Sequence, residues 1–427
     1  MGPAPHLLLQ LAVILVAARV LAWLLQRLGQ PPVIGEMLAG FALGPVVLGA
    51  LAPGVHEALF PPASLPALEA LSQFGLVLFM FLVGAGLRLP AGVRSRLAVA
   101  GWTGSLGVAL PMALGLAIAP YLYAHHAPAG VAAWPFALFI AASMAVTAVP
   151  VLARLLGDTG MAQTRIGQVA LAGAAVADAL AWVALALVLA VLGAAGGWAS
   201  LARTAGGLLL LAAACLGVLR PLLARWLLRH APDGRPGAAL FGILLALACS
   251  AAAATQWLGL HALFGAFLFG ACLPRDDRLC ASLHARLEPV AVLLLMPVFF
   301  AMAGLHATPD AFAAASLPAL GLVLAAAVLG KLAGAGGGAR LGGLGWREAL
   351  AVGALMNARG LMELVVLQVG LDAGVIGNAM FTLLLVMAIA TTLMATPLMR
   401  LCLRGTQGAA PVPATTMPTI ASATPNP

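Results

Sequence analysis

The stretch GQVALAGAAVADALAWVALALVLAVLG, residues 167–193, is apolar from residue 169 onward except for one charged side chain, Asp178. About 20 apolar residues are enough to cross a ~30 Å hydrocarbon layer as a helix. Asp178 lies about eleven residues into the stretch, or ~16 Å along a helix. The stretch therefore predicts a transmembrane helix with a carboxyl group at mid-membrane. An ionisable side chain is costly at that depth and usually functional.

The composition extends this prediction to the whole chain. Of its residues 63% are hydrophobic and only 8% charged, and the mean hydropathy is +1.08, whereas soluble domains carry about 25% charged residues. We expect an all-α, polytopic membrane protein in contact with lipid. The five cysteines have neither zinc-ligand nor disulfide spacing, so no transition-metal site is expected.

Apolar runs bounded by glycine, proline and charge predict about thirteen transmembrane helices, the first retained as a span and not removed as a signal peptide. The predicted spans are 7–28, 31–51, 67–87, 97–119, 134–156, 167–193, 203–228, 238–258, 259–275, 287–305, 314–336, 347–369 and 377–403.

The arginines predict the orientation. When the loops are assigned to alternate sides, most arginines fall together and only Arg203 falls clearly opposite. The arginine-rich side is cytoplasmic by the positive-inside rule, which places the N-terminus outside and the C-terminus inside the cell (inner) membrane. The net charge of +8 thus reports topology, and no nucleic-acid partner is expected.

Two further segments bear on regulation. Residues 404–427 are rich in Pro, Thr and Ala and predict a disordered cytoplasmic tail. The glycine-rich segment 334–345 does not follow a strand, so it predicts a helix end and a turn, not a dinucleotide site. We expect no nucleotide-binding regulatory domain in this chain.

Asp178 is the candidate exchange site. Desolvation at mid-membrane favours its protonated form, so a cation and a proton can compete for one carboxyl group. This competition is the simplest mechanism of antiport. The structural alternative is an aspartate that only pairs with a basic neighbour.

Two spans carry residues that interrupt helices. One holds Thr147 and Pro150, and the other holds Asn357, Arg359 and Gly360. Proline removes a backbone donor and glycine loosens a helix, and broken spans in corresponding positions of two halves indicate an ion site. The arrangement predicts two inverted six-helix repeats with two broken, crossing helices. For Pro150 alone, a packing kink is the alternative.

Other charges within the spans have structural alternatives. Arg359 and Glu363 lie four residues apart and can neutralise each other as an internal pair. A permanent charge at Arg359 would also offset the carbonyl ends of half-helices. Glu36 is interpreted as structural, and Lys331 is the remaining clear intramembrane cation.

Several segments together carry a resemblance that covers nearly all of residues 7–403. The sequence resembles the cation/proton antiporter-2 family of the sodium/proton exchanger superfamily, and is most similar to its single-aspartate cation/H⁺ exchangers. The segments are QPPVIGEMLAGFALGP (30–45), FLVGAGLRL (81–89), SMAVTAVPVLARLL (143–156), AAVADALAW (174–182), HALFGAFLFGACLP (261–274), MPVFFAMAGL (296–305) and GALMNARGLMELVVLQVGL (353–371).

The resemblance implies a homodimer in which a mobile, ion-carrying core moves against a static interface domain by an elevator-like step. Interface helices 1–3 and 8–10 would lie in residues 1–96 and 238–305. Core helices 4–6 and 11–13 would lie in residues 97–193 and 306–403. Residues 194–237 would form linker helix 7.

The resemblance also assigns roles. It implies that Asp178 is the essential ion-binding aspartate, Thr147 the polar residue of the first broken helix, and Arg359 the arginine of the second. Lys331 matches a lysine near that site, where it either pairs with Asp178 or snorkels. Relatives have Asp or Asn where this chain has Ala177. Single-aspartate members tend to be electroneutral, which implies one cation per proton.

We therefore expect a transporter that exchanges Na⁺ or K⁺ for H⁺ in pH homeostasis, with no cofactor and no enzymatic activity. A sodium-coupled organic-anion symporter of similar architecture and a transport-inactive sensor or partner subunit are the alternatives. An intramembrane hydrolase is disfavoured because the sequence has one suitable aspartate and no GxGD or GxSxG motif.

Overall fold

The structure is a computed structural model of the 427-residue chain. It describes residues 3–86, 97–162, 164–193, 206, 210, 213–231, 233–257, 262–274 and 276–404. The secondary structure of these residues is helical, and they contain no strand. The predicted all-α class is confirmed.

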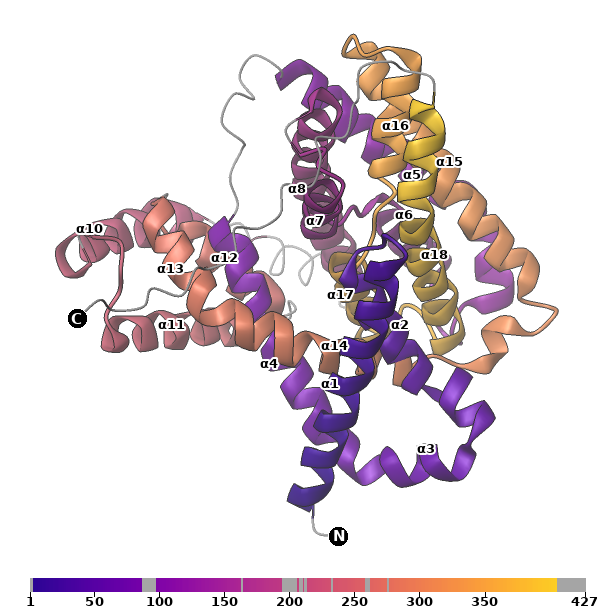
Figure 1. The fold of residues 1–427 in the computed structure, drawn as a ribbon, viewed down its shortest axis with the longest axis horizontal. Coiled ribbons are helices and arrows are strands. Elements are labelled where there is room, and N and C mark those ends of the chain that lie inside the picture. The colour runs from indigo at the N-terminus through magenta and orange to yellow at the C-terminus, as the bar shows by residue number, and fades with distance from the viewer. Residues whose placement is uncertain are drawn as a thin grey trace, which may run out of the picture.

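The helices follow one another along the chain, and Figure 1 labels them. They are α1 (Pro3–Arg27), α2 (Pro32–Leu43), α3 (Pro53–Leu59), α4 (Leu65–Gly86), α5 (Leu97–His126), α6 (Ala133–Ala145), α7 (Val149–Asp158), α8 (Arg165–Gly193), α10 (Arg220–His230), α11 (Ala238–Trp257), α12 (Ala262–Cys272), α13 (Asp277–Glu288), α14 (Met296–Leu305), α15 (Leu317–Leu341), α16 (Trp346–Leu355), α17 (Leu361–Asp372) and α18 (Asn378–Leu403). Short helical turns join or extend them at Pro45–Gly49, Pro62–Ser64, Cys215–Leu219, Pro289–Leu295 and Pro309–Phe312.

Seven helical stretches in the described part of the chain are long and apolar enough to cross a membrane. This finding confirms a multi-pass membrane protein, while the count of about thirteen crossings stays a prediction. The seven stretches are His6–Arg27, Pro53–Gly86, Ala98–His126, Ala238–Trp257, Asp277–Leu305, Leu317–Leu341 and Asn378–Leu403.

Several predicted boundaries change. The span expected at 31–51 is interrupted after Leu43, and the one expected at 287–305 begins ten residues earlier, at Asp277. Hydropathy did not predict the earlier start because α13, the first part of the stretch Asp277–Leu305, is amphipathic, with buried leucines beside exposed charges. Part of the span expected at 203–228, before residue 213, and nearly all of the tail at 404–427 lie outside the described residues.

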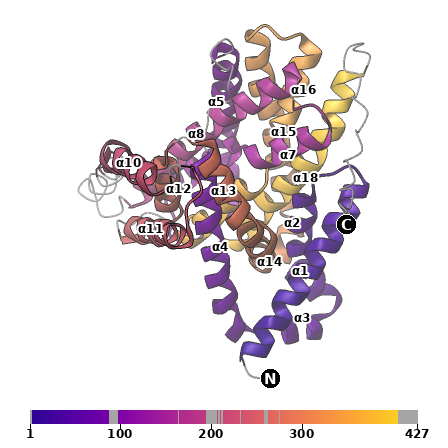
Figure 2. The same ribbon diagram turned by 60° about the vertical axis from the view of Figure 1, so that its left-hand side comes forward.

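The helices pack in two groups. In one, α5 and α15 lie together and contact α6, α8, α16 and α18. In the other, α4 packs on α12 and α14, while α2 packs on α1 and α14 and α11 packs on α12. Figures 1 and 2 show α10 and α11 standing away from α15, α16 and α18. A contact between α2 and α18 joins the two groups.

Close contact between α2 and α14 depends on two glycines. A Cβ atom on Gly304 would lie 1.9 Å from the carbonyl oxygen of Gly40, and a Cβ on Gly40 would lie 2.0 Å from that of Phe300. Small residues let helix backbones approach this closely in membranes. Any side chain at either position would force the two helices apart.

Three prolines leave the carbonyl oxygen four residues before them without an N–H partner, because proline has no backbone donor. In each case a side chain from elsewhere in the chain donates to that oxygen, and for Gly107 this pairs a buried carbonyl, as buried backbone groups require. The donors and acceptors are Lys331 to Gly107 before Pro111 (3.0 Å), Arg19 to Leu293 before Pro297 (3.1 Å), and Gln30 to Leu393 before Pro397 (3.3 Å).

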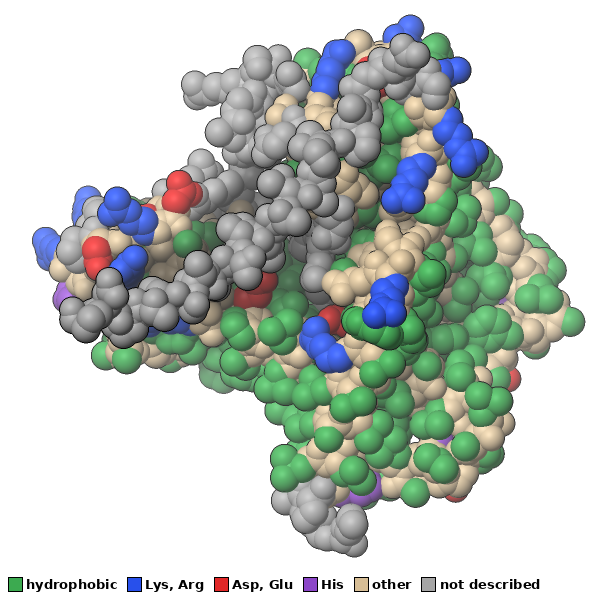
Figure 3. All heavy atoms as spheres, viewed as in Figure 1, with side chains coloured by type: hydrophobic (Ala, Val, Ile, Leu, Met, Phe, Trp, Pro, Cys, Tyr) green, Lys and Arg blue, Asp and Glu red, His purple; other side chains and the backbone are tan. Residues whose placement is uncertain are grey.

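Charge is distributed unevenly over the surface. On the face shown in Figure 3, Lys and Arg side chains gather at the upper ends over α15 and α16 and around α10, while the lower part is largely hydrophobic. The N-terminus lies at the lower end in Figure 1, and α18 runs toward the upper end.

Candidate ion-binding site

The first predicted break lies between α6 and α7. Helix α6 ends at Ala145, residues 146–148 are not helical, and α7 begins at Val149. Pro150 is the second residue of α7, where its missing N–H costs no helical bond. Thr147 lies within the gap and is fully buried. The residues that predicted an interruption here therefore form one.

The second break, residues 356–360, crosses the first. The N–H of Ala148 donates to the carbonyl oxygen of Ala358 at 3.1 Å, which joins the two interrupted backbones directly. A Cβ atom on Gly360 would lie 2.7 Å from Cγ2 of Val151. Glycine at 360 thus permits the close crossing.

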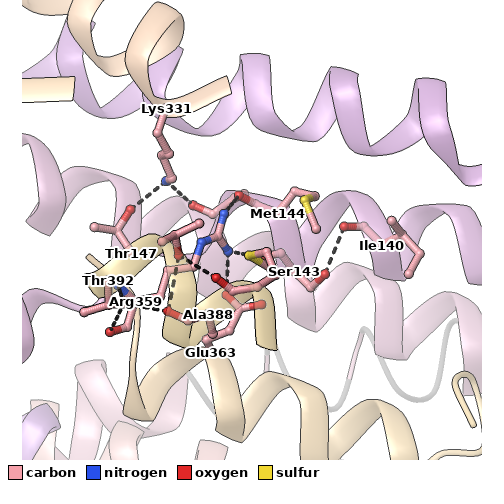
Figure 4. Close-up of polar contacts among 12 residues, drawn as sticks. Ile140, Ser143, Met144, Thr147, Lys331, Arg359, Glu363, Ala388 and Thr392 are labelled. Atoms are coloured by element: carbon pink, nitrogen blue, oxygen red, sulfur yellow. Dashed lines mark hydrogen bonds and ion pairs between the residues drawn. The ribbon is translucent and has the colours of Figure 1, made fainter. Parts of the chain in front are cut away.

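Lys331 extends from α15 into the first break (Figure 4). Its Nζ donates to the carbonyl oxygens of Gly107 (3.0 Å) and Ala145 (2.6 Å) and to Oγ1 of Thr147 (2.6 Å). These bonds use the three N–H donors of an ammonium group. The side chain is 0% exposed, so Lys331 does not snorkel to the membrane surface.

Arg359 caps the same helix end from the second break. Its Nη1 donates to the carbonyl oxygen of Ser143 (2.9 Å), and its Nη2 donates to that of Met144 (2.7 Å). Together with the bond from Lys331 to Ala145, three successive terminal carbonyls of α6 receive a cationic donor. A helix C-terminus carries negative partial charge, and two fixed cations offset it here.

Glu363 balances Arg359. Its Oε2 accepts a hydrogen bond from Nη1 of Arg359 at 2.8 Å, and both side chains are fully buried. The predicted internal pair is therefore formed. Burial is tolerable for such a pair only where further hydrogen bonds satisfy the charges, and the two α6 carbonyls accept from Nη1 and Nη2 of the guanidinium.

Sequence reasoning missed two contributors. Thr392 of α18 accepts the backbone N–H of Arg359 at 2.8 Å, which holds the second break in place. Gly107 of α5 provides a carbonyl for Lys331. A threonine in an apolar helix carries no distinctive signal. Gly107, however, was marked by Pro111 four residues later, since that proline frees its carbonyl.

Asp178 lies within α8 and is 6% exposed. Helix α8 packs against α5 and against α6 and α16, which end at the first and the second break. The hydrogen bonds of Lys331 go to α5 and to the first break, and not to Asp178. Ala177 is fully buried beside it and brings no polar atom.

Three side chains at the second break have buried polar atoms without a partner among the residues described. The atoms are both amide atoms of Asn357, Nε of Arg359 and Oε1 of Glu363. An unsatisfied buried polar atom costs about 1–3 kcal/mol. The Asn357 amide oxygen is therefore a strong acceptor available to a cation or a water molecule.

Glu36 belongs to a different part of the molecule. Its Oε1 lies 3.2 Å from Nη1 of Arg19, which joins α2 to α1. This contact supports the structural interpretation of Glu36.

Long apolar helices with two crossed interruptions and buried charges are the features of a secondary transporter, a class in which the ends of half-helices commonly face the ion site. The profile of the family described as "Sodium/hydrogen exchanger, transmembrane" matches residues 13–403. The chain belongs to this family, and the resemblance inferred from its motifs is confirmed.

Curated relatives extend the comparison. The chain is 37% identical to the Na⁺/H⁺ antiporter NhaS4 of Synechocystis sp. over 92% of its own length and 96% of that protein. It is 35% identical to cation/H⁺ antiporter 19 of Arabidopsis thaliana, covering 95% of this chain and 51% of the plant protein. It is 33% identical to K⁺/H⁺ antiporter 1 of Saccharomyces cerevisiae, covering 94% and 46%. The chain thus spans about half the length of the plant and yeast relatives.

Among solved structures, the fold is similar to that of the sodium proton antiporter MjNhaP1 from Methanocaldococcus jannaschii. The TM-score is 0.62 at 16% identity, over 93% of this chain and 99% of that one. At this identity the likeness establishes the antiporter fold alone.

Proposed function

We propose that this protein exchanges a monovalent cation for H⁺ by alternating access, with Asp178 binding the two competitively. The observation that carries the proposal is the burial of this carboxylate on α8, a helix packed against two crossed breaks whose negative helix end is already neutralised. Lys331 and Arg359 both donate to α6 carbonyls, and we assign the change of charge during exchange to Asp178.

The neighbouring side chains have supporting roles in this proposal. Thr147 and Asn357 supply neutral oxygens to a dehydrated cation, Asn357 with an amide that has no partner among the described residues. Pro150 maintains the first break. Arg359, Lys331 and Glu363 compensate charge and do not carry the ion.

The stoichiometry is proposed to be one cation per proton. Ala177 provides no second carboxylate beside Asp178. A site with one ionisable carboxyl group carries one positive charge in each direction, either as H⁺ or as the cation. Transport is then electroneutral.

Both Na⁺ and K⁺ are proposed as substrates. The cyanobacterial relative is named a Na⁺/H⁺ antiporter and the yeast relative a K⁺/H⁺ antiporter. The ligand oxygens and their charges suit either ion, and the expected role is pH homeostasis.

The movement is proposed to occur between the two helix groups. Helices α5–α8 and α15–α18 would form the mobile core, and α1, α2, α4 and α11–α14 the interface domain of a homodimer. The inner membrane, with the N-terminus outside and the C-terminus cytoplasmic, is the proposed location. Packing of the helices in two groups supports this division.

Everted vesicles provide the test of function. Addition of NaCl or KCl should trigger proton efflux with the wild-type protein and none with Asp178→Asn. Asp310→Asn, at an exposed acid, is the matched control and should leave exchange intact. Full activity of Asp178→Asn would refute the proposal.

Two other outcomes would identify the alternatives. Sodium-driven uptake of an organic anion without proton counterflow would indicate a symporter. Absence of any cation-dependent flux from a folded, inserted protein would indicate a sensor or partner subunit. Stoichiometry is tested separately in proteoliposomes, where an imposed voltage should leave the exchange rate unchanged.

A further inference from the structure

A cavity of about 270 Å³ lies where the α1–α2 connection meets α7 and α18, and Asp178 is not among its lining residues. Its polar lining includes Gln26 from the last turn of α1, Gln30 from the connection, Thr159 after α7, and Thr396 and Arg400 from α18. Several of these residues are exposed at the surface, so the cavity opens outward.

Arg400 gives this cavity a positive charge. No hydrogen bond or ion pair of its guanidinium is found among the described residues, and none of the described lining residues is acidic. Its Nη2 lies 3.9 Å from where a Cβ on Gly29 would stand. Gly29 has φ +72°, and the absence of a side chain leaves the guanidinium room over the turn. A cation is disfavoured here, whereas an anion would satisfy Arg400.

Thr396 supplies a second donor. It is 2% exposed, and its Oγ1 has no partner among the described residues although it lines the cavity. The Thr159 hydroxyl is already engaged, since it donates to the carbonyl oxygen of Leu155 at 2.7 Å. A buried hydroxyl without a partner costs free energy that an acceptor in the cavity would offset.

Gln30 adds a feature that bears on ligand class. Its Nε2 donates to the Leu393 carbonyl freed by Pro397, and its buried Oε1 has no partner in the described part of the chain. The cavity therefore presents a fixed cation and a free hydroxyl donor beside one free acceptor. An oxyanion that also carries hydroxyl groups matches this set, and the volume exceeds what a single halide ion needs.

The cavity lies at the level expected for lipid headgroups. The guanidinium of Arg27 stacks over the ring of Trp23 at 3.8 Å, near the end of α1. Leu24 and Leu28 are exposed on the same helix turns. Trp and Arg residues at the end of a span mark a membrane–water interface, and Arg forks recognise phosphate bidentately.

We propose that the cavity formed by Gln30, Thr396 and Arg400 binds a phosphate-type oxyanion, supplied either by an anionic lipid headgroup or by a soluble phosphate. The site is separate from Asp178, and its binding is measured without transport, so it stands or falls independently of the antiport proposal.

The experiment uses the full chain purified in dodecyl maltoside. Phosphatidylglycerol, phosphatidylcholine and inorganic phosphate are titrated separately, with retained lipid measured by native mass spectrometry and phosphate binding by calorimetry. We expect Arg400→Gln to weaken binding of the preferred probe at least tenfold and Thr396→Val to weaken it severalfold. Arg347→Gln, which removes an exposed arginine of α16, should change nothing.

The probes distinguish the two sources. Selective retention of phosphatidylglycerol with no response to phosphate identifies a lipid headgroup, and binding of inorganic phosphate alone identifies a soluble ligand. Arg400→Lys, which keeps the charge but loses the fork, guards against misfolding and should bind with intermediate affinity. Equal binding by wild type and Arg400→Gln, or equal loss in Arg347→Gln, would overturn the proposal.

Discussion

The hydrogen bond between Lys331 and Gly107 leads to a prediction about coupling between Lys331 and Pro111. Pro111 cannot donate to the Gly107 carbonyl, so the Lys331 ammonium is its donor at 3.0 Å. Lys331→Met removes that donor and also leaves the Ala145 carbonyl and the Thr147 hydroxyl oxygen without it. Three unsatisfied buried acceptors cost roughly 3–9 kcal/mol, at about 1–3 kcal/mol each. Removal of the buried ammonium, which is costly to desolvate, offsets part of this cost.

A double-mutant cycle separates the loss of the hydrogen bond to Gly107 from the desolvation of the ammonium. In Pro111→Ala, the new backbone N–H at position 111 satisfies Gly107, whether or not the lysine is present. Lys331→Met should therefore destabilise the protein less in the Pro111→Ala background, by about 1–3 kcal/mol. The free energy of desolvating the Lys331 ammonium is removed by Lys331→Met in both backgrounds, so it cancels when the two effects are subtracted. Equilibrium unfolding in mixed detergent measures the four free energies of unfolding.

Pro120, also inside α5, provides the matched control, because no side chain is found to donate to the carbonyl it frees among the described residues. Pro120→Ala and Lys331→Met should combine additively within about 0.5 kcal/mol. If the effects of Pro111→Ala and Lys331→Met were also additive, the inference that Lys331 replaces the missing N–H donor of the Gly107 carbonyl would be wrong.

The remaining predictions concern charge, stoichiometry and packing. Glu363→Leu alone should destabilise the protein by about 3–5 kcal/mol, since it leaves the buried Arg359 guanidinium without its counter-charge. The double variant with Arg359→Met should not recover this loss in the same unfolding assay, because it also removes the donors of the Ser143 and Met144 carbonyls. Ala177→Asp adds a second carboxylate beside the exchange site, so we expect exchange in proteoliposomes to become voltage-dependent, and voltage-independent exchange would contradict the single-carboxylate argument. Gly304→Ala should abolish the peak of folded protein in size-exclusion chromatography, because its Cβ would force α2 and α14 apart and disrupt their packing. Gly321→Ala, where a Cβ meets nothing within 4 Å, should leave that peak unchanged.

Much of the architecture was determined by the sequence alone. Hydropathy identified an all-helical membrane protein, because a chain with so few charges has no soluble alternative. Proline and glycine located both breaks, at Thr147–Pro150 and Asn357–Gly360, since their effect on a helix is local. Boundaries were less predictable where an amphipathic segment such as α13 extends an apolar span.

Only the tertiary structure decided which groups meet at the breaks. Lys331 donates to an α6 carbonyl 186 positions away, and Arg359 donates to one 216 positions away, so no local pattern could show that both cap the end of α6. The same holds for Thr392, which became part of the site only when α18 packed against the second break. The sequence does not mark the backbone carbonyls at the end of α6, because every residue type has the same carbonyl group. The fold decides which cationic side chains from elsewhere in the chain reach these carbonyls once they have lost their helical N–H partners.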